Sequence, residues 1–291
     1  MRAALNSPLD PNGNRPLTAN QNEYVRITAD RRRRLLGALG EALIADGQRG
    51  AGLDTLSLAV TDGWDLELLK RVASQQLQTG DTAGLLRVEA RITVDPRTLP
   101  AHIDSVTRLA ISRVGSANWA IARNNARREM VRETMNRSLL RSIRGDPNGI
   151  DSAGRALSLK AMTAGQPSVI VYWSRHCGPA LASLSAIDSV GRVLRRQGVP
   201  VYLIADESPS PDIANFFRER QVVVPVLYDS RKEISRGLGN FGTPAYYVLD
   251  GGGRIRFNHV REVNDLLLQI EAIRSSDVST TSQALSSRRS H

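Results

Sequence analysis

Residues 169–180 read Val-Ile-Val-Tyr-Trp-Ser-Arg-His-Cys-Gly-Pro-Ala, and this stretch decides the fold of the C-terminal half of the chain. The apolar run 169–173 is typical of a short buried strand. Cys177 follows four residues later, directly before Gly178 and Pro179, and proline is favoured in the first turn of a helix. Apolar residues then recur at helical spacing until Gly198, which is a helix stop. The pattern predicts a strand, a tight turn that carries Cys177, and a helix.

The residues around this stretch continue the rhythm of an α/β domain. Two turn signals at 146–154 mark its start. We expect further strands or apolar pieces at 200–205, 222–227, 245–249 and 254–257, and helices at 213–220 and 263–273. Asp250 to Gly253 is a hairpin signal between the last two strands. The predicted domain covers residues 146–274.

Cys177 is the single cysteine of the chain. It therefore excludes an internal disulfide framework, a cysteine-only zinc site and dithiol chemistry within the chain. The free amide groups of a helix start favour an anion beside them, so this position favours the thiolate. Arg175 and His176, if protonated, would act in the same direction. The alternative is a buried and inert cysteine.

Residues Trp173 to Ala180 resemble the active-site turn of thioredoxin-fold proteins of the TlpA/ResA type, which usually reads Trp-x-x-Trp-Cys-Gly-Pro-Cys. Residues 151–159 resemble the hairpin that precedes the first core strand of that family, and residues 241–244 resemble its Gly-Thr-Pro segment, whose proline is cis. The resemblance covers roughly residues 146–274. It implies a thioredoxin-like domain, a central mixed sheet flanked by helices.

The chain departs from the family where Ala180 replaces the second cysteine. A dithiol enzyme needs that second thiol to resolve its mixed disulfide, so the resemblance implies a monothiol thiol-disulfide oxidoreductase with Cys177 as its catalytic residue. Ser183 stands where ResA-type members carry a glutamate. The implied partners are protein disulfides or thiols and an external thiol reductant, with neither a cofactor nor a metal. The implied substrate-binding residues are Trp173, His176, Gly178, Pro179, Thr243 and Pro244.

Three other functions are alternatives to the thiol-disulfide oxidoreductase hypothesis. The first is a non-catalytic binding or scaffold module that holds partners in the groove beside Pro244. The second is a one-cysteine peroxidase, for which Ser174 stands at the threonine position but Ile170 at the proline position. The third is a copper chaperone that would use Cys177, His176 and His259, although it lacks a second sulfur ligand.

In the N-terminal half, the residue pattern predicts a flexible leader over 1–27 and a mainly helical domain over 28–145. Helical spacing covers 35–44, 66–77 and 103–143, with an interruption near Gly115, whereas 85–94 fits a strand or an extended link. The end of this half is rich in arginine from 123 to 144. It fits an acidic partner, a phosphate backbone or a lipid headgroup, or simply a solvated helix face. The Ser- and Thr-rich tail 275–291 predicts disorder.

Composition limits the remaining choices. With 41% hydrophobic and 23% charged residues in 291, the chain can bury ordinary cores, and no apolar run is long enough to span a bilayer. The formal charge of +10 comes from arginine, since only three of the 39 basic residues are lysines, and we do not expect nucleic acid as a partner. The resemblance implies a periplasmic or other extracytoplasmic location, whereas the lack of a recognisable signal peptide favours the cytoplasm. The oligomeric state is left open.

Overall fold

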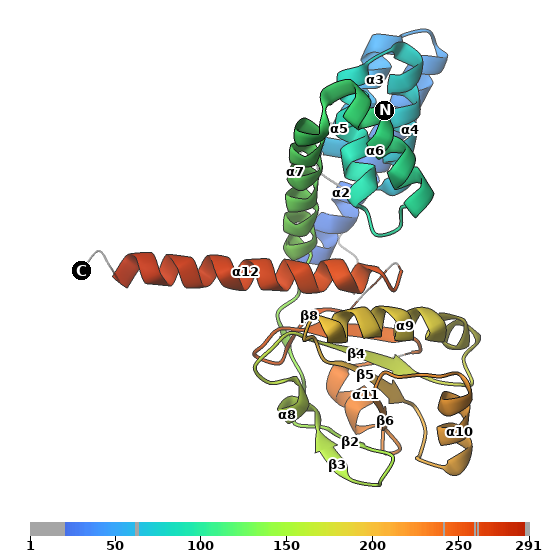
Figure 1. Cartoon of the computed structure of the whole chain (residues 1–291), viewed down its shortest axis with the longest axis vertical. Coiled ribbons are helices and arrows are strands. Elements are labelled where there is room, and N and C mark those ends of the chain that lie inside the picture. Colours follow the sequence, from blue (N-terminus) through green and yellow to red (C-terminus); the bar gives the residue numbers. More distant parts are fainter. Residues whose placement is uncertain (1–20, 62–63, 241, 259, 261, 289–291) are drawn as a thin grey trace. The chain divides into compact units, whose positions relative to one another are not determined.

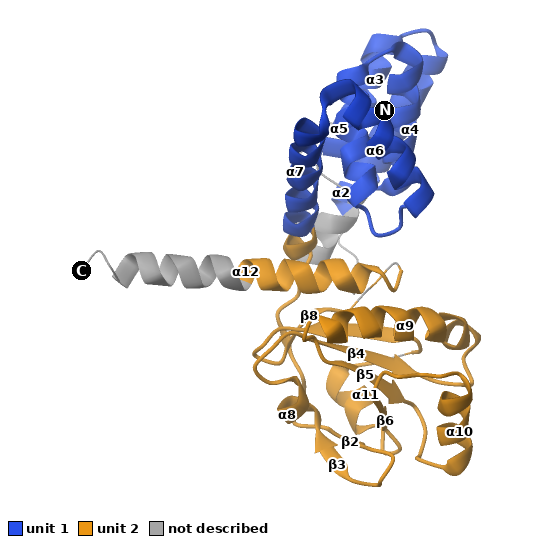
Figure 2. Cartoon of the chain, viewed as in Figure 1, with its two compact units in different colours: residues 1–133 blue, residues 134–291 orange. Residues whose placement is uncertain are grey.

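The chain forms two compact units, Met1–Glu133 (unit 1) and Thr134–His291 (unit 2), in a computed structural model (Figures 1 and 2). The structure describes residues 21–61, 64–240, 242–258, 260 and 262–288. Residues 1–20 of the predicted leader, together with Phe241 and His259, lie outside the described residues. No described helix is long and apolar enough to cross a membrane.

Unit 1 is helical, as the spacing of its apolar residues predicted. Its helices are α2 (Gln21–Ala45), α3 (Arg49–Thr61), α4 (Leu66–Thr79), α5 (Thr82–Val94), α6 (Pro100–Val114) and α7 (Ser116–Asn136). Asp65 caps α4 by accepting from the amides of the second and third helical residues, and Gly80 ends that helix in the left-handed conformation at φ 74°. Gly115, at φ 81°, separates α6 from α7 where the interruption was predicted.

As far as the described residues go, unit 2 is built on one mixed sheet of eight strands in the order β1-β8-β7-β4-β5-β6-β2-β3. The strands are β1 (Arg141–Ser142), β2 (Asn148–Ile150), β3 (Ala156–Ser158), β4 (Ser168–Trp173), β5 (Val201–Ala205), β6 (Val226–Tyr228), β7 (Ala245–Leu249) and β8 (Arg254–Phe257). Its helices are α8 (Leu159–Thr163), α9 (Gly178–Arg196), α10 (Pro211–Glu219), α11 (Glu233–Leu238) and α12 (Asp265–Arg288). The predicted thioredoxin-like α/β fold is confirmed.

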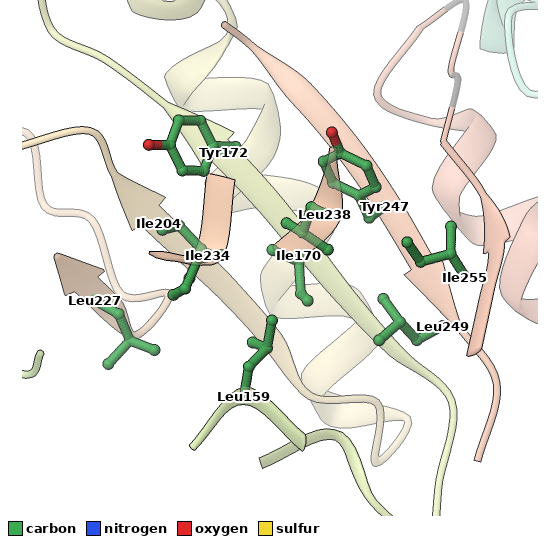
Figure 3. Packing of buried hydrophobic residues seen from close by; sticks show 10 residues of the cluster. All are labelled: Leu159, Ile170, Tyr172, Ile204, Leu227, Ile234, Leu238, Tyr247, Leu249 and Ile255. Carbon is green, nitrogen blue, oxygen red and sulfur yellow. The ribbon is translucent and has the colours of Figure 1, made fainter. Parts of the chain in front are cut away.

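The central strand β4 is buried along its whole length because helices cover both faces of the sheet. It pairs parallel with β5 and antiparallel with β7. Apolar side chains of five strands pack with α8 and α11 on one face, as Figure 3 shows. This cluster is Leu159, Ile170, Tyr172, Ile204, Leu227, Ile234, Leu238, Tyr247, Leu249 and Ile255. In Figure 1, α9 and α12 cover the other face.

The structure differs from the sequence-based boundaries in four places. Residues 85–94 lie in helix α5 and not in a strand or link, because Asp81 caps that helix by accepting from the amide of Gly84. α2 begins at Gln21, inside the predicted leader. The division between the units falls at residue 133 and not at 145, because β1 pairs with β8 and so joins the sheet. α12 continues to Arg288, through most of the predicted disordered tail, and residues 265–288 contain neither Gly nor Pro to end it.

Candidate active site

Sheet register brings Cys177 and Thr243 together, although 66 residues separate them. β4 and β7 run antiparallel with Tyr172 opposite Ala245, so the turn after β4 and the loop before β7 meet at one edge of the sheet. The Cys177 thiol donates a hydrogen bond to the carbonyl oxygen of Thr243, with Sγ and O 3.0 Å apart. The Thr243–Pro244 peptide bond is cis, which confirms that prediction.

Cys177 occupies the N-cap of α9 in an extended conformation, with φ −109° and ψ 114°. Its amide donates to the carbonyl of Ser174 at 3.3 Å, and its own carbonyl accepts from Leu181 N at 2.9 Å. Cys177 is therefore hydrogen-bonded through its backbone both to the preceding turn and to the first turn of α9. Cys177 itself is half-buried.

Exposed residues flank Cys177 both in α9 and in the loop before β7. Gly178 and Pro179 are exposed on the α9 side, and Gly242 is exposed on the side of the loop before β7. A Cβ atom added at Gly178 or at Gly242 would meet no heavy atom of the described residues within 4 Å. His176 is also exposed, with 74% of its side chain accessible. The structure thus gathers His176, Gly178, Pro179, Thr243 and Pro244 around Cys177.

Trp173 lies behind the turn and is fully buried, so it cannot contact a substrate as the sequence had led us to expect. Its indole Nε1 donates to the carbonyl of Ala180 at 2.7 Å. Its ring packs against Phe216 and Phe217, with centroids 5.6 and 5.3 Å away. Trp173 therefore holds the first turn of α9 in place. Ala180 is likewise fully buried.

Glu207 is a site residue that sequence reasoning missed. Its Oε2 lies 2.8 Å from Arg175 Nε and 4.0 Å from His176 Nε2, and only 11% of its side chain is exposed. Its charge is opposite to that of Arg175 and, at the longer distance, to that of a protonated His176. Its place in the sequence could have indicated this role, because Glu207 comes shortly after β5. β5 runs parallel to β4, so the carboxyl ends of the two strands lie side by side.

A second polar cluster lies at the same edge of the sheet. The Tyr172 hydroxyl donates to Asp206 Oδ1 at 2.7 Å and lies 3.1 Å from Asp229 Oδ2. Asp229 also accepts from the amides of Ile234 and Ser235 at the start of α11. Burial, together with the Asp229 charge, raises the pKa of Tyr172 far above its usual range. Tyr172 is therefore a fixed hydrogen-bond donor at neutral pH, not an acid-base group.

No group of three or more His, Cys, Asp or Glu side chains in the described part of the chain is placed to hold a metal ion. His259, which the copper chaperone hypothesis required, lies outside the described residues. Among the described residues, Cys177 supplies the one thiol of the site, and it is half-buried.

One protein-family model matches part of unit 2, and several solved structures are similar to part of the chain. Residues 145–258 match the AhpC/TSA family model. A thiol:disulfide interchange protein from Bacteroides sp. is 15% identical, with 47% of this chain and 91% of that chain covered and a TM-score of 0.42. A putative thiol:disulfide interchange protein DsbE from Chlorobium tepidum is 19% identical, with 46% and 97% covered and a TM-score of 0.41. The exposed lipoprotein thioredoxin Etrx1 of Streptococcus pneumoniae is 21% identical, with 43% and 96% covered and a TM-score of 0.36. No curated protein matches the chain.

Proposed function

We propose that unit 2 catalyses thiol-disulfide exchange through Cys177 alone, by way of mixed disulfides with protein substrates. The observation that carries this proposal is the position of Cys177, which is half-buried and occupies the N-cap of α9. Exposed backbone at Gly178 and Gly242 lets an extended disulfide-bearing segment reach that sulfur. The sole cysteine and the buried Ala180 leave resolution to an outside thiol.

The reaction consists of two successive thiol-disulfide exchange steps. First, the proton that Thr243 O accepts passes to solvent, and the Cys177 thiolate attacks one sulfur of a substrate disulfide. A bond from Cys177 to that sulfur forms, the substrate disulfide breaks, and the other substrate sulfur leaves as a thiolate that takes up a proton. Second, the thiolate of an external reductant attacks the substrate sulfur of the mixed disulfide and releases the Cys177 thiolate. The reductant and substrate sulfurs end as a disulfide, and Cys177 undergoes no net oxidation.

The test uses the full chain and oxidised glutathione, followed by intact-mass measurement. We expect one glutathione adduct per chain under native conditions, complete removal of the adduct by reduced glutathione, and no adduct on a Cys177→Ser control. An adduct that forms only in denaturant would refute the proposal. So would a native protein that gives sulfenic acid with hydrogen peroxide but no adduct with the disulfide, because that result identifies a one-cysteine peroxidase.

One observation favours a binding module as the second candidate. The Cys177 thiol donates to a carbonyl oxygen, and this hydrogen bond stabilises the neutral thiol, the less nucleophilic form. In that case the groove beside Pro244 holds an extended partner by backbone pairing, without covalent chemistry. A binding module predicts that a peptide partner is retained equally by the wild type and by Cys177→Ser.

We further propose that the protein works outside the cytoplasm, where protein disulfides are the available substrates. The proposal rests on the resemblance of residues 173–180 and 241–244 to TlpA/ResA-type proteins. Fractionation of cells that express the full natural gene tests it, and recovery of the protein only in the cytoplasm would oppose it.

A further inference from the structure

Unit 2 contains a pocket of about 540 Å³ that does not include Cys177. It lies where the segment between β1 and β2 meets α11 and the residues directly after α11. Arg144, Asp146, Glu233, Arg236 and Asn240 supply its polar side chains. Its volume is in the range of small-molecule sites, which is about 300–1,000 Å³.

The pocket is held open by fixed backbone contacts. The amide of Arg144 donates to the carbonyl of Gly237 at 3.0 Å, which ties the β1–β2 segment to α11. A Cβ atom at Gly237 would lie 2.8 Å from Pro147 Cγ, so only glycine permits this approach. The amide of Asn240 donates to Ser235 O at 2.8 Å, which fixes the opposite wall.

The charged side chains of the pocket differ in the hydrogen bonds that they make. Asp146 Oδ1 accepts from Ser158 Oγ at 2.7 Å and from the Lys160 amide at 3.3 Å. Glu233 Oε2 accepts from the Asn148 amide at 3.5 Å.

The two guanidinium groups differ from these carboxylates. Within the described residues, neither Arg144 nor Arg236 has a hydrogen bond or an ion pair through its side chain. Asn240 uses its side-chain oxygen to accept from Tyr247 OH at 3.1 Å, which leaves its NH₂ group as a donor. Asp146 Oδ2 and Glu233 Oε1 also have no hydrogen bond among the described residues. The pocket therefore offers free acceptors as well as free donors, and two of its donors, the exposed guanidinium groups of Arg144 and Arg236, are cationic.

We propose that this pocket binds a small molecule through an oxyanion, a carboxylate or a phosphate, held by Arg144 and Arg236. Guanidinium groups pair with such oxyanions through two parallel hydrogen bonds, which a single-point cation cannot do. The Asn240 amide supplies a third, neutral donor. The site is separate from Cys177 and does not depend on thiol chemistry.

The test titrates the full chain with inorganic phosphate and, separately, with succinate, and follows backbone amide resonances. We expect saturable shifts that include Ser235, Gly237, Gly239 and Asn240. Arg144→Gln and Arg236→Gln should each weaken binding about tenfold, since a charge-assisted hydrogen bond is lost. The probe that binds with the higher affinity shows whether the pocket prefers a phosphate or a carboxylate.

The matched control is Arg196→Gln, because Arg196 is an exposed arginine of the same unit in the last turn of α9, away from the pocket. This control should leave binding unchanged, as should Cys177→Ser, which separates the pocket from the proposed thiol chemistry. Equal losses in Arg196→Gln and Arg236→Gln would overturn the proposal, since they would show non-specific attraction to a basic protein. Shifts that never saturate, or that avoid the pocket in the wild type, would overturn it whether or not the variants fold.

Discussion

Replacing Trp173 by Phe tests whether this buried side chain holds the first turn of α9. The change removes the indole Nε1 that donates to Ala180 O at 2.7 Å but keeps an aromatic ring near Phe216 and Phe217. The lost hydrogen bond costs about 0.5–1.5 kcal/mol. The smaller ring leaves a cavity, for which we add about 1–2 kcal/mol as a fraction of the 3–5 kcal/mol of a full truncation. We therefore expect unit 2 to lose about 2–3 kcal/mol.

The assay must report unit 2 alone, because the other two tryptophans, Trp64 and Trp119, lie in unit 1. Amide hydrogen exchange of the β4 peptide meets this need. A loss of 2–3 kcal/mol should speed exchange of its slowest amides by about 30- to 150-fold. Ser183→Ala is the matched control, since the Ser183 hydroxyl donates to the same Ala180 carbonyl at 2.9 Å without filling the core.

We expect Ser183→Ala to speed the exchange less than tenfold. Exchange that is slower in Trp173→Phe than in Ser183→Ala would refute our account of Trp173. So would a Trp173→Phe protein that is fully folded but cannot form the Cys177 adduct, because that result would give Trp173 a direct role in substrate binding.

Three further changes probe the site and its scaffold. Ala180→Cys should convert a reaction that stops at the Cys177 adduct into steady disulfide reduction in an insulin assay with added reductant, and an inert variant would argue against a retained nucleophile. Glu207→Gln should speed iodoacetamide labelling of Cys177 roughly two- to fivefold near neutral pH, because the charge of Arg175 is no longer offset; unchanged labelling would show that this pair does not influence the sulfur. Burial raises the pKa of Asp250, but hydrogen bonds from the Arg254 backbone and side chain outweigh it and hold the pKa below its usual value. Its stabilising effect is thus complete above pH of about 4 and is lost as pH falls through the lowered folded-state pKa. In urea unfolding at neutral pH, Asp250→Asn should lower the free energy of unfolding by about 1–3 kcal/mol. The variant should also lose less of this free energy than the wild type as the pH falls below about 4. An equal loss in both proteins would exclude Asp250 as the source of the acid sensitivity.

The position of Cys177 could be predicted because it depends on local patterns. A five-residue apolar run, a turn and a proline in the next helical turn together define a strand-to-helix switch, and β4 and α9 begin and end close to where this pattern places them. β7 and β8 have the predicted bounds for the same reason, since turn residues 250–253 separate two short apolar runs. Thr243 and Pro244 were placed beside Cys177 through the family resemblance, and the register of β4 against β7 gives the physical reason.

Other features depend on contacts between distant residues, which a single sequence does not display. The pattern of 85–94 was interpreted as a strand or an extended link, which was wrong: these residues lie in α5, whose start Asp81 caps. The 145/146 boundary looked convincing from its turn residues, but pairing of β1 with β8 assigns the preceding residues to the sheet. Burial of Trp173 followed from the apolar run 169–173, but its neighbours did not: its indole contacts Ala180 of α9 and the rings of Phe216 and Phe217 of α10.

The sequence by itself determined that the chain has one thiol and that this thiol stands at the start of a helix after a buried strand. Periodicity and turn chemistry act between residues a few positions apart, so they can be read along the chain. Only the tertiary structure decided that Thr243 O accepts from Cys177, that Glu207 neutralises Arg175, and that Arg144 and Arg236 share a pocket. These contacts join residues from 32 to 92 positions apart, and their geometry is set by strand order and register, which follow from the packing of the whole sheet.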